Sequence, residues 1–245
     1  MNKFINAIIA VFILLSAGCK KENVYQSDNN STVIVVNGVS SNPTFSLLLS
    51  MNGKLNPSGM TGTSSISSVN YGTGAFYFCP KASNQIGVLK GTDSTSLLSA
   101  TYDLSGNSFY SLFIAGQAPN VEAVLVKEIN YPYIRQDFIA TAADSVIRIR
   151  FINLSPNAAP LNFRITGSTN NEATGIAYKG YTDFVSYPAK IANTSYKFDV
   201  VEGTTVLTTF TLSVTGTNRF KNVAILVRGL KGGTPALGVS TVNYF

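Results

Sequence analysis

Few side chains in this protein could carry out chemistry, because the sequence contains no histidine and only two cysteines. Without histidine, Ser-His-Asp and Cys-His nucleophile systems are excluded, and the most versatile acid–base group is missing. Two carboxylates could still hydrolyse a glycosidic bond. The nearest group of acids is Asp183, Asp199 and Glu202, but the last two flank a predicted hairpin turn, where solvated acids are common. We therefore expect no enzyme, with a carboxylate-based glycan hydrolase as the alternative.

Motifs for metals and cofactors are also missing from the sequence. No cysteine and histidine cluster has zinc-ligand spacing, and no Asp-x-Asp-x-Asp calcium loop occurs. The segment GLKGGT at 229–234 lacks the Gly-x-x-x-x-Gly-Lys-Ser/Thr spacing of a phosphate-binding loop, so it predicts a β-turn. We expect no metal, no cofactor and no catalytic residues.

Positive charge is concentrated in the second half of the chain. The formal net charge is +6. Residues 32–131 are balanced, whereas residues 145–245 hold ten basic and four acidic side chains. The basic residues neither cluster nor fit a nucleic-acid-binding motif, so no nucleic-acid partner is expected. The excess predicts a solvated basic surface or contact with an anionic glycan or lipid headgroup.

The first 18 residues are typical of a secretory signal peptide. Lys3 supplies the positive start, and an apolar run follows from Ile5 to Leu15, too short to span a membrane. The sequence LSAGC at 15–19 matches the bacterial lipobox, in which cleavage precedes a lipid-bearing cysteine. Several acyl chains on Cys19 would anchor the mature protein firmly. We therefore expect lipidation at Cys19 and attachment to the membrane through this lipid.

The mature chain is expected to begin with a flexible polar tether at 19–31. Charged residues directly after the cysteine, here Lys20-Lys21-Glu22, resemble the export signals of Bacteroidetes surface lipoproteins, which are richer in acids. The expected location is the bacterial cell envelope, at the periplasmic face or the cell surface of the outer membrane. Cys79 then has no cysteine partner, and its apolar surroundings predict a buried, inert thiol.

Beyond the tether the sequence repeats itself with a period of roughly 110 residues. Three pairs of segments recur in the same order: VIVVNGVSSNPTFSLLL with IRFINLSPNAAPLNFRI, VNYGTGAFYFCPKA with IAYKGYTDFVSYPAK, and the stretches that end in Gly116 and Gly229. The alignment places Asn37 on Asn153, Tyr71 on Tyr178, and Pro80 on Pro188.

Each repeat reads as all-β. In SVIRIRFIN, Ile147, Ile149 and Phe151 alternate with Arg148 and Arg150, which predicts one apolar face and one partly charged face. YKFDVVEG alternates in the same way, with Tyr196, Phe198 and Val200 on one side. Together with TVLTTFTLSV it predicts a hairpin at 203–204. We expect two tandem immunoglobulin-like β-sandwich domains, at 32–130 and 145–245, joined by a linker at 131–144.

The second unit resembles the bacterial domain family of unknown function DUF4397. The resemblance rests on NLSPNAAP at 153–160, the tyrosine-rich middle, the Gly-Thr hairpin and the late apolar strand NVAILVRG. It covers about 145–245, and the first unit is a diverged copy that lacks the Ser-Pro pair. The family implies a secreted or lipid-anchored tandem β domain and supplies no site residues.

Aromatic residues are the remaining candidates for binding. Tyr178, Tyr181, Phe184 and Tyr187 alternate imperfectly, so some rings could face outward and stack on sugars or on a protein partner. The competing interpretation is that they fill the cores. The sequence therefore predicts a lipid-anchored envelope protein that acts as a binding or structural, adhesive module. A further alternative is a subunit of a surface fibre, which would need an unpaired edge strand.

Overall fold

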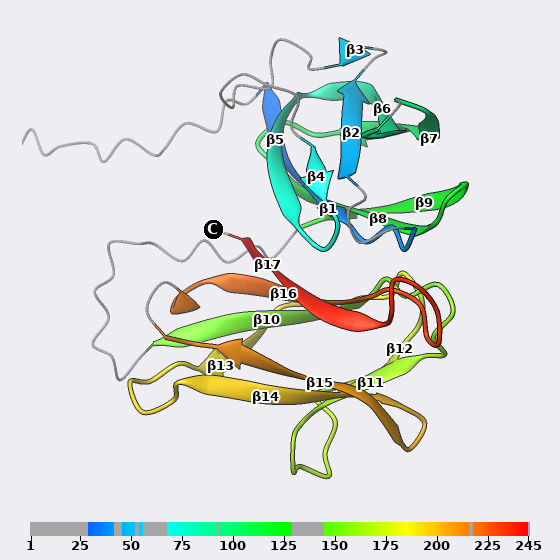
Figure 1. The fold of residues 1–245 in the computed structure, drawn as a ribbon. Coiled ribbons are helices and arrows are strands. Elements are labelled where there is room, and N and C mark those ends of the chain that lie inside the picture. The colour runs from blue at the N-terminus through cyan, green and yellow to red at the C-terminus, as the bar shows by residue number, and fades with distance from the viewer. Residues whose placement is uncertain are drawn as a thin grey trace, which may run out of the picture.

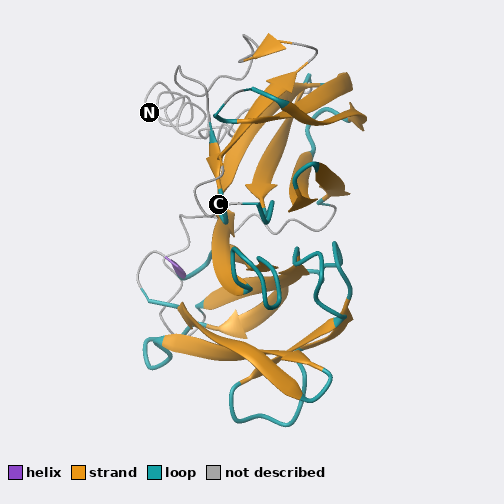
Figure 2. Ribbon diagram, turned by 45° about the vertical axis from the view of Figure 1, so that its right-hand side comes forward, coloured by secondary structure: helices purple, strands orange, loops and turns teal. Residues whose placement is uncertain are grey.

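The computed structural model describes residues 29–41, 46–51, 54–55, 68–92, 94–128, 145–215 and 218–244. The signal peptide, Cys19, most of the tether and the 131–144 linker lie outside the described residues. Within those ranges the chain forms strands, turns and loops and no α-helix, and the short helical piece drawn in Figure 2 is a 3-10 turn at Asn218 (Figure 1, Figure 2). The predicted all-β sandwich class is confirmed.

The first half of the chain forms two sheets that face each other. One sheet has the order β5-β1-β8-β9, with strands Gly74–Pro80, Asn30–Asn37, Phe109–Gln117 and Asn120–Lys127. The other has the order β3-β2-β6-β7, and β4 also pairs with β2. Its strands are Lys54–Leu55, Ser46–Met51, Ala82–Lys90, Ser96–Leu104 and, for β4, Val69–Asn70.

The second half repeats this arrangement. Its first sheet has the order β13-β10-β16-β17, with strands Val185–Pro188, Val146–Asn153, Asn222–Arg228 and Gly238–Tyr244. Its second sheet has the order β12-β11-β14-β15, with strands Ala173–Ile176, Leu161–Ile165, Ser195–Glu202 and Thr205–Ser213. In both halves the first strand lies inside a sheet and runs parallel to the penultimate strand, β8 or β16.

The residues aligned in the sequence repeat stand at the same places in the two halves. Asn37 lies opposite Ile114 in its parallel pair, and Asn153 lies opposite Val227. Pro80 pairs with Asn30 at the end of β5, and Pro188 pairs with Val146 at the end of β13. The sequence repeat therefore corresponds to a repeat of strand order.

Glycines close the turns that define each half. Gly116 and Gly229 both have a positive φ, at 101° and 88°, and a Cβ at either would lie 2.3 or 2.2 Å from a backbone oxygen. Only glycine fits such a site without strain. The predicted hairpin at 203–204 is present, since Glu202 pairs with Thr205 and Gly203 has φ 59°.

Each half buries its own apolar core between its two sheets. The first core holds alternate residues of β1, β5, β6 and β8, including Val33, Val35, Tyr77, Cys79, Val88 and Leu112. The second holds alternate residues of β10, β11, β14 and β16, including Ile149, Phe151, Phe163, Phe198, Val200 and Ile225. The apolar faces predicted for β10 and β14 are therefore the faces that point into the second core.

A third apolar core lies between the halves, so the four sheets stack as layers (Figure 1). It joins residues of the first half to residues of the second: Ile34, Val36, Phe109, Phe113, Ala115 and Val126 with Ile152, Leu154, Ala224, Leu226, Val242 and Tyr244. We call this junction the seam. The sequence predicted a partly charged face on β10, but the seam covers it, and Arg150 is only 2% exposed.

Candidate functional site at the seam

Two buried asparagines hold equivalent loops in the two halves, and the loop held by Asn153 leads to the candidate aromatic residues. Asn153 donates from Nδ2 to the carbonyl of Ile176, and its Oδ1 accepts from the backbone N–H of Ser155. Asn37 makes the same pair of bonds, to the carbonyl of Val69 and from the N–H of Val39. Both asparagines are fully buried, so these hydrogen bonds satisfy side-chain amide groups whose burial without a partner would destabilise the fold. Both asparagines therefore act in turn chemistry.

Tyr178 and Tyr181 lie in the segment after β12, directly after the Ile176 carbonyl that Asn153 bonds, and at the rim of the seam. Lys179 forms a 2.9 Å ion pair with Glu122 of the first half. Burial, together with the charge of Glu122, raises the pKa of Tyr178, and the hydrogen bond from Lys179 lowers the pKa of Glu122. Tyr181 is 39% exposed, and its ring centroid lies 6.5 Å from that of Phe113 in the first half.

Phe184 and Tyr187 lie deeper and on different faces of the sheet. Phe184 packs against the seam core, with its ring 5.2 Å from that of Tyr244. Tyr187 is 6% exposed and belongs to the second core, where its hydroxyl donates to Glu172 at 2.8 Å. Burial and this bond raise the pKa of Tyr187. The four candidate rings therefore do not share one surface: Tyr187 is a core residue, and Tyr181 alone among them is exposed.

A buried ion pair crosses the seam beneath these rings. Arg150 of β10 donates from both terminal nitrogens to the two oxygens of Glu128, which follows β9, at 2.5 and 2.8 Å. The two side chains are 3% and 4% exposed. Burial alone would disfavour the charge on Arg150, but the two bonds and the negative charge of Glu128 outweigh it and raise the pKa of Arg150.

Aromatic rings and hydroxyls complete the surroundings of this pair. The guanidinium carbon of Arg150 lies 4.3 Å from the ring centroid of Phe184 and 5.3 Å from that of Tyr181. Ser111 donates to Glu128 at 2.6 Å, and its hydroxyl lies 3.0 Å from the Tyr244 hydroxyl. Such an arrangement is suited to fixing the orientation of one half relative to the other, because a bidentate ion pair with a stacked guanidinium has a well-defined geometry.

No sequence pattern indicates the Arg150–Glu128 pair, although one pattern indicates that a further layer covers the central strands. The strands VIVV, FYSLFIAG and NVAILVRG are apolar on both faces. A strand with two apolar faces must be covered on both sides. A single sandwich covers only one, so these runs required a further layer.

The candidate acids are held separately rather than as a catalytic pair. Asp199 accepts from Thr166 at 2.6 Å, from Thr209 at 3.1 Å and from Arg164 at 3.4 Å, and these bonds, Thr166 foremost, lower its pKa. Glu202 pairs with Lys231 and accepts from the N–H of Ala159. Hydrogen bonds from Lys231 and from Ala159 lower the pKa of Glu202. Asp183 is solvent-exposed.

The remaining sequence predictions concern Cys79 and the 229–234 segment. Cys79 is 1% exposed, and burial raises its pKa to about 12, so the thiol is inert as predicted. The 229–234 segment connects β16 to β17 as a turn, closed by bonds from Gly233 N–H to the Leu230 carbonyl and from Leu230 N–H to the Pro235 carbonyl.

The described residues contain neither a metal-binding cluster nor a membrane-spanning helix. Within the described part of the chain, no three His, Cys, Asp or Glu side chains are placed to hold a metal ion. Among the same residues, no helix has the length and apolar character needed to cross a membrane. The predicted lipidation residue, Cys19, lies outside them.

Comparison with known proteins gives no family assignment. No family model matches the chain, and no curated protein matches it. Among solved structures, the CBMbc module of family CBM26 from Eubacterium rectale Amy13K, crystallised with maltoheptaose, aligns over 88% of this chain and 96% of its own. The identity is 10% and the TM-score is 0.25, which carries no argument about function.

Proposed function

We propose that this protein is a lipid-anchored component of the bacterial cell envelope that acts as a binding or structural module and is not an enzyme. Cys19 is its lipidated residue, and the two sandwiches are members of the DUF4397 family. The body is a rigid platform held at a membrane, and its partner is a glycan or another envelope protein.

The third apolar core is the observation that supports this proposal most. A short flexible connection would be enough to link two independent domains, yet here twelve buried apolar residues and an enclosed ion pair join them. An interface this apolar fixes the relative orientation of the halves. A fixed orientation is useful to a protein that presents surfaces to a partner or transmits force, and the separately held acids offer no comparable support for hydrolysis.

Mass spectrometry of the mature N-terminus tests the anchoring. The expected N-terminal residue is Cys19 with a diacylglyceryl thioether and an acylated amine. Cys19→Ser should abolish both the lipid and the retention of the protein in the membrane fraction. An unmodified N-terminus downstream of Cys19 would contradict the proposal.

A glycan array and an envelope-extract pull-down with the mature chain test the binding role. Tyr181 is the candidate ring that is exposed, so Tyr181→Ala should weaken binding of any captured partner about tenfold, the scale of an aromatic anchor. Val206→Ala, which truncates another exposed side chain (42% exposed), is the matched control and should leave binding unchanged. Equal binding of both variants would exclude Tyr181 from the contact.

One observation favours a fibre subunit as the second candidate function. Strand β15 lies at the edge of its sheet, and its nine residues TVLTTFTLS contain neither a charge nor a proline. Proteins commonly place charged residues or proline on edge strands to prevent pairing with another chain, so β15 lacks this protection. Analytical ultracentrifugation should then show concentration-dependent assembly that Thr211→Lys removes. A strictly monomeric chain would contradict this candidate.

A further inference from the structure

One end of the molecule collects basic side chains together with apolar side chains that are exposed or half-buried. We call it the tether end, because β1 begins there at Asn30, eleven residues after Cys19. Its members come from both halves: the basic residues Lys81, Lys127, Lys190, Arg219 and Lys221 and the apolar residues Phe78, Ile191 and Phe220.

In the first half, strand pairing places these residues beside the start of β1. The backbone N–H of Lys81 donates to the carbonyl of Asn29. Phe78 pairs with Thr32 and is 39% exposed. Lys127 is the last residue of β9, is exposed, and lies 6.0 Å from the ring centroid of Tyr110.

In the second half, the corresponding residues surround the start of β10. The backbone N–H of Phe220 donates to the carbonyl of Val146, and the backbone carbonyl of Lys221 accepts from the N–H of Arg148. Arg219 donates from Nε to the carbonyl of Ala189. The neighbouring loop contributes the exposed residues Lys190 and Ile191, and Ile191 is 66% exposed, the highest among the large apolar side chains described.

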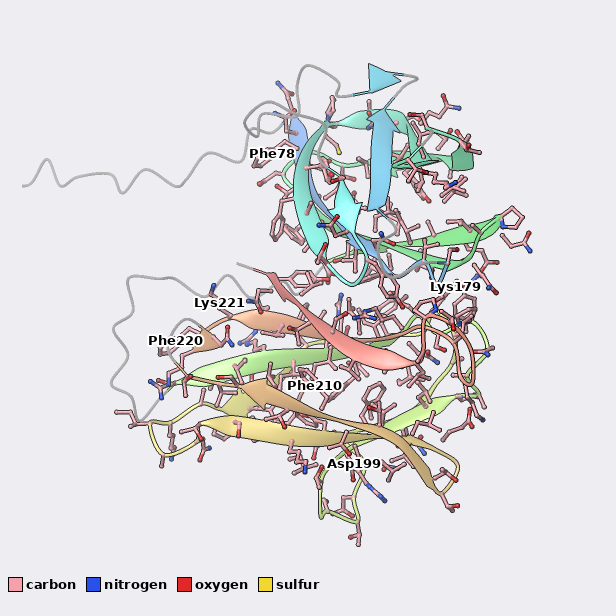
Figure 3. The ribbon with its side chains drawn as sticks, viewed as in Figure 1. Phe78, Lys179, Asp199, Phe210, Phe220 and Lys221 are labelled. Carbon is pink, nitrogen blue, oxygen red and sulfur yellow. The ribbon has the colours of Figure 1, made fainter. Side chains whose placement is uncertain are left out.

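Contacts across the seam show that the two starting ends point the same way. Tyr244, near the end of β17, meets Ser111 near the start of β8. At the opposite end of the seam, directly after the last residues of β1 and β10, a Cβ on Gly38 would lie 2.6 Å from the Leu154 side chain. Figure 3 shows Phe78, Phe220 and Lys221 on one side of the molecule and Lys179 on the opposite side.

The charges at the two ends differ in their pairing. At the end away from the tether, Lys179 pairs with Glu122 and Lys231 pairs with Glu202. At the tether end, none of the five basic side chains makes an ion pair with a carboxylate of the described residues. Glu128 is occupied by Arg150. The exposed acids near this end include Asp103, near the end of β7, and Glu172, which accepts from the Tyr187 hydroxyl.

The geometry points to a second, non-covalent membrane contact: the tether end docks on an anionic phospholipid surface. This inference rests on the proposed lipid anchor. Eleven residues span at most about 40 Å and on average about 18 Å, so the anchor keeps this end near the bilayer. Each lysine or arginine near an anionic surface contributes about fivefold to binding, and exposed apolar side chains enter the headgroup boundary.

Vesicle co-sedimentation of the mature chain carrying Cys19→Ser tests this contact without the lipid. The vesicles contain phosphatidylethanolamine with phosphatidylglycerol, and pure phosphatidylcholine vesicles serve as the neutral reference. We expect binding to the anionic vesicles at low salt and its loss at about 0.5 M salt, where screening is strong. Lys81→Gln with Lys221→Gln should weaken binding about 10- to 30-fold.

The matched control is Lys179→Gln with Lys231→Gln, which removes the same charge at the end away from the tether and should change binding less than about twofold. All four side chains are at least partly solvent-exposed, so both variants should keep an unfolding midpoint close to that of the parent. Equal effects of the two variants, equal binding to neutral vesicles, or no binding would overturn the inference. A lipidated Cys19 found together with any of these results would leave the proposed anchoring intact.

Discussion

The two sandwiches share a strand order but differ at the face where they meet. Asn37 and Asn153 are equivalent residues at the ends of β1 and β10. Counting back three residues from each gives Ile34 in the first half and Arg150 in the second, so these two positions are equivalent. Glu128 lies opposite Phe109, the first residue of β8, and Tyr244 lies opposite the first residue of the equivalent strand β16. Glu128 and Tyr244 are therefore also equivalent positions. The first half therefore contributes a buried negative charge, Glu128, and the second half a buried positive charge, Arg150, at positions that are not equivalent in the repeat. The halves are complementary partners rather than interchangeable copies.

Residues that shape the backbone show the opposite behaviour. Gly116 and Gly229 have the same strained conformation, and Asn37 and Asn153 make the same hydrogen bonds. These positions specify the sandwich and are the same in both halves, whereas positions on the seam specify which faces pair. Substitutions of the two kinds should therefore differ in both size and symmetry.

Glu128→Ala should give the largest effect. Removing one partner of a buried pair leaves Arg150 charged and enclosed, which costs about 3–5 kcal/mol of unfolding free energy. Chemical denaturation followed by circular dichroism measures the loss.

The control for this prediction replaces both partners, with Glu128→Leu and Arg150→Met together. A well-packed apolar pair in place of a buried ion pair is often close to neutral. The double variant should therefore recover most of the stability lost in Glu128→Ala. A single-variant loss below about 1 kcal/mol would mean that the pair is not buried as described.

Gly116→Ala and Gly229→Ala should each cost about 2–3 kcal/mol, because alanine meets both the positive φ and a backbone oxygen. Gly167→Ala is the control: its φ is 87°, but nothing lies within 4 Å of its Cβ position. That variant should lose only about 1 kcal/mol. Markedly unequal losses at Gly116 and Gly229 would contradict the equivalence of the halves.

Asp199→Asn should have a moderate and pH-dependent effect. Because the folded pKa is lowered below the unfolded value of about 3.9, the ionised group stabilises the protein above that pH, and the contribution is lost as pH falls through the folded pKa. Urea denaturation should show parent and variant separated by about 1 kcal/mol at neutral pH. The difference should shrink below about pH 4, and a constant difference would argue against ionisation as its cause.

Lys179→Ala should have the smallest effect. Its ion pair with Glu122 also crosses the seam, but the side chains are 33% and 50% exposed. Exposed pairs contribute about 0.5 kcal/mol or less, and added salt should remove the difference. A loss comparable with that of Glu128→Ala would show that the rim of the seam is more important than its centre.

The sequence was sufficient for most of the local structure. Alternation in YKFDVVEG identified Phe198 and Val200 as core residues, and the Gly203 hairpin followed from turn chemistry. The buried state of Cys79 followed from its apolar neighbours. These features depend on short-range patterns, which one sequence displays directly.

The residue contacts across the seam could not be predicted in the same way, because they join residues far apart in the chain. Arg150 lies in an alternating pattern that normally indicates a solvated face, and Glu128 lies 22 residues earlier, directly after β9 of the other half. Tyr187 shows the same limit: its spacing allowed a surface position, and only the packing of β13 against the second core buries it.

Scanning calorimetry of the mature chain tests the central claim, that the seam makes the two sandwiches one body. One cooperative transition is expected for the parent, because unfolding either half would expose the shared core and break the Arg150–Glu128 pair. Glu128→Ala should separate the signal into two transitions. Two independent transitions in the parent, unchanged by Glu128→Ala, would contradict the account.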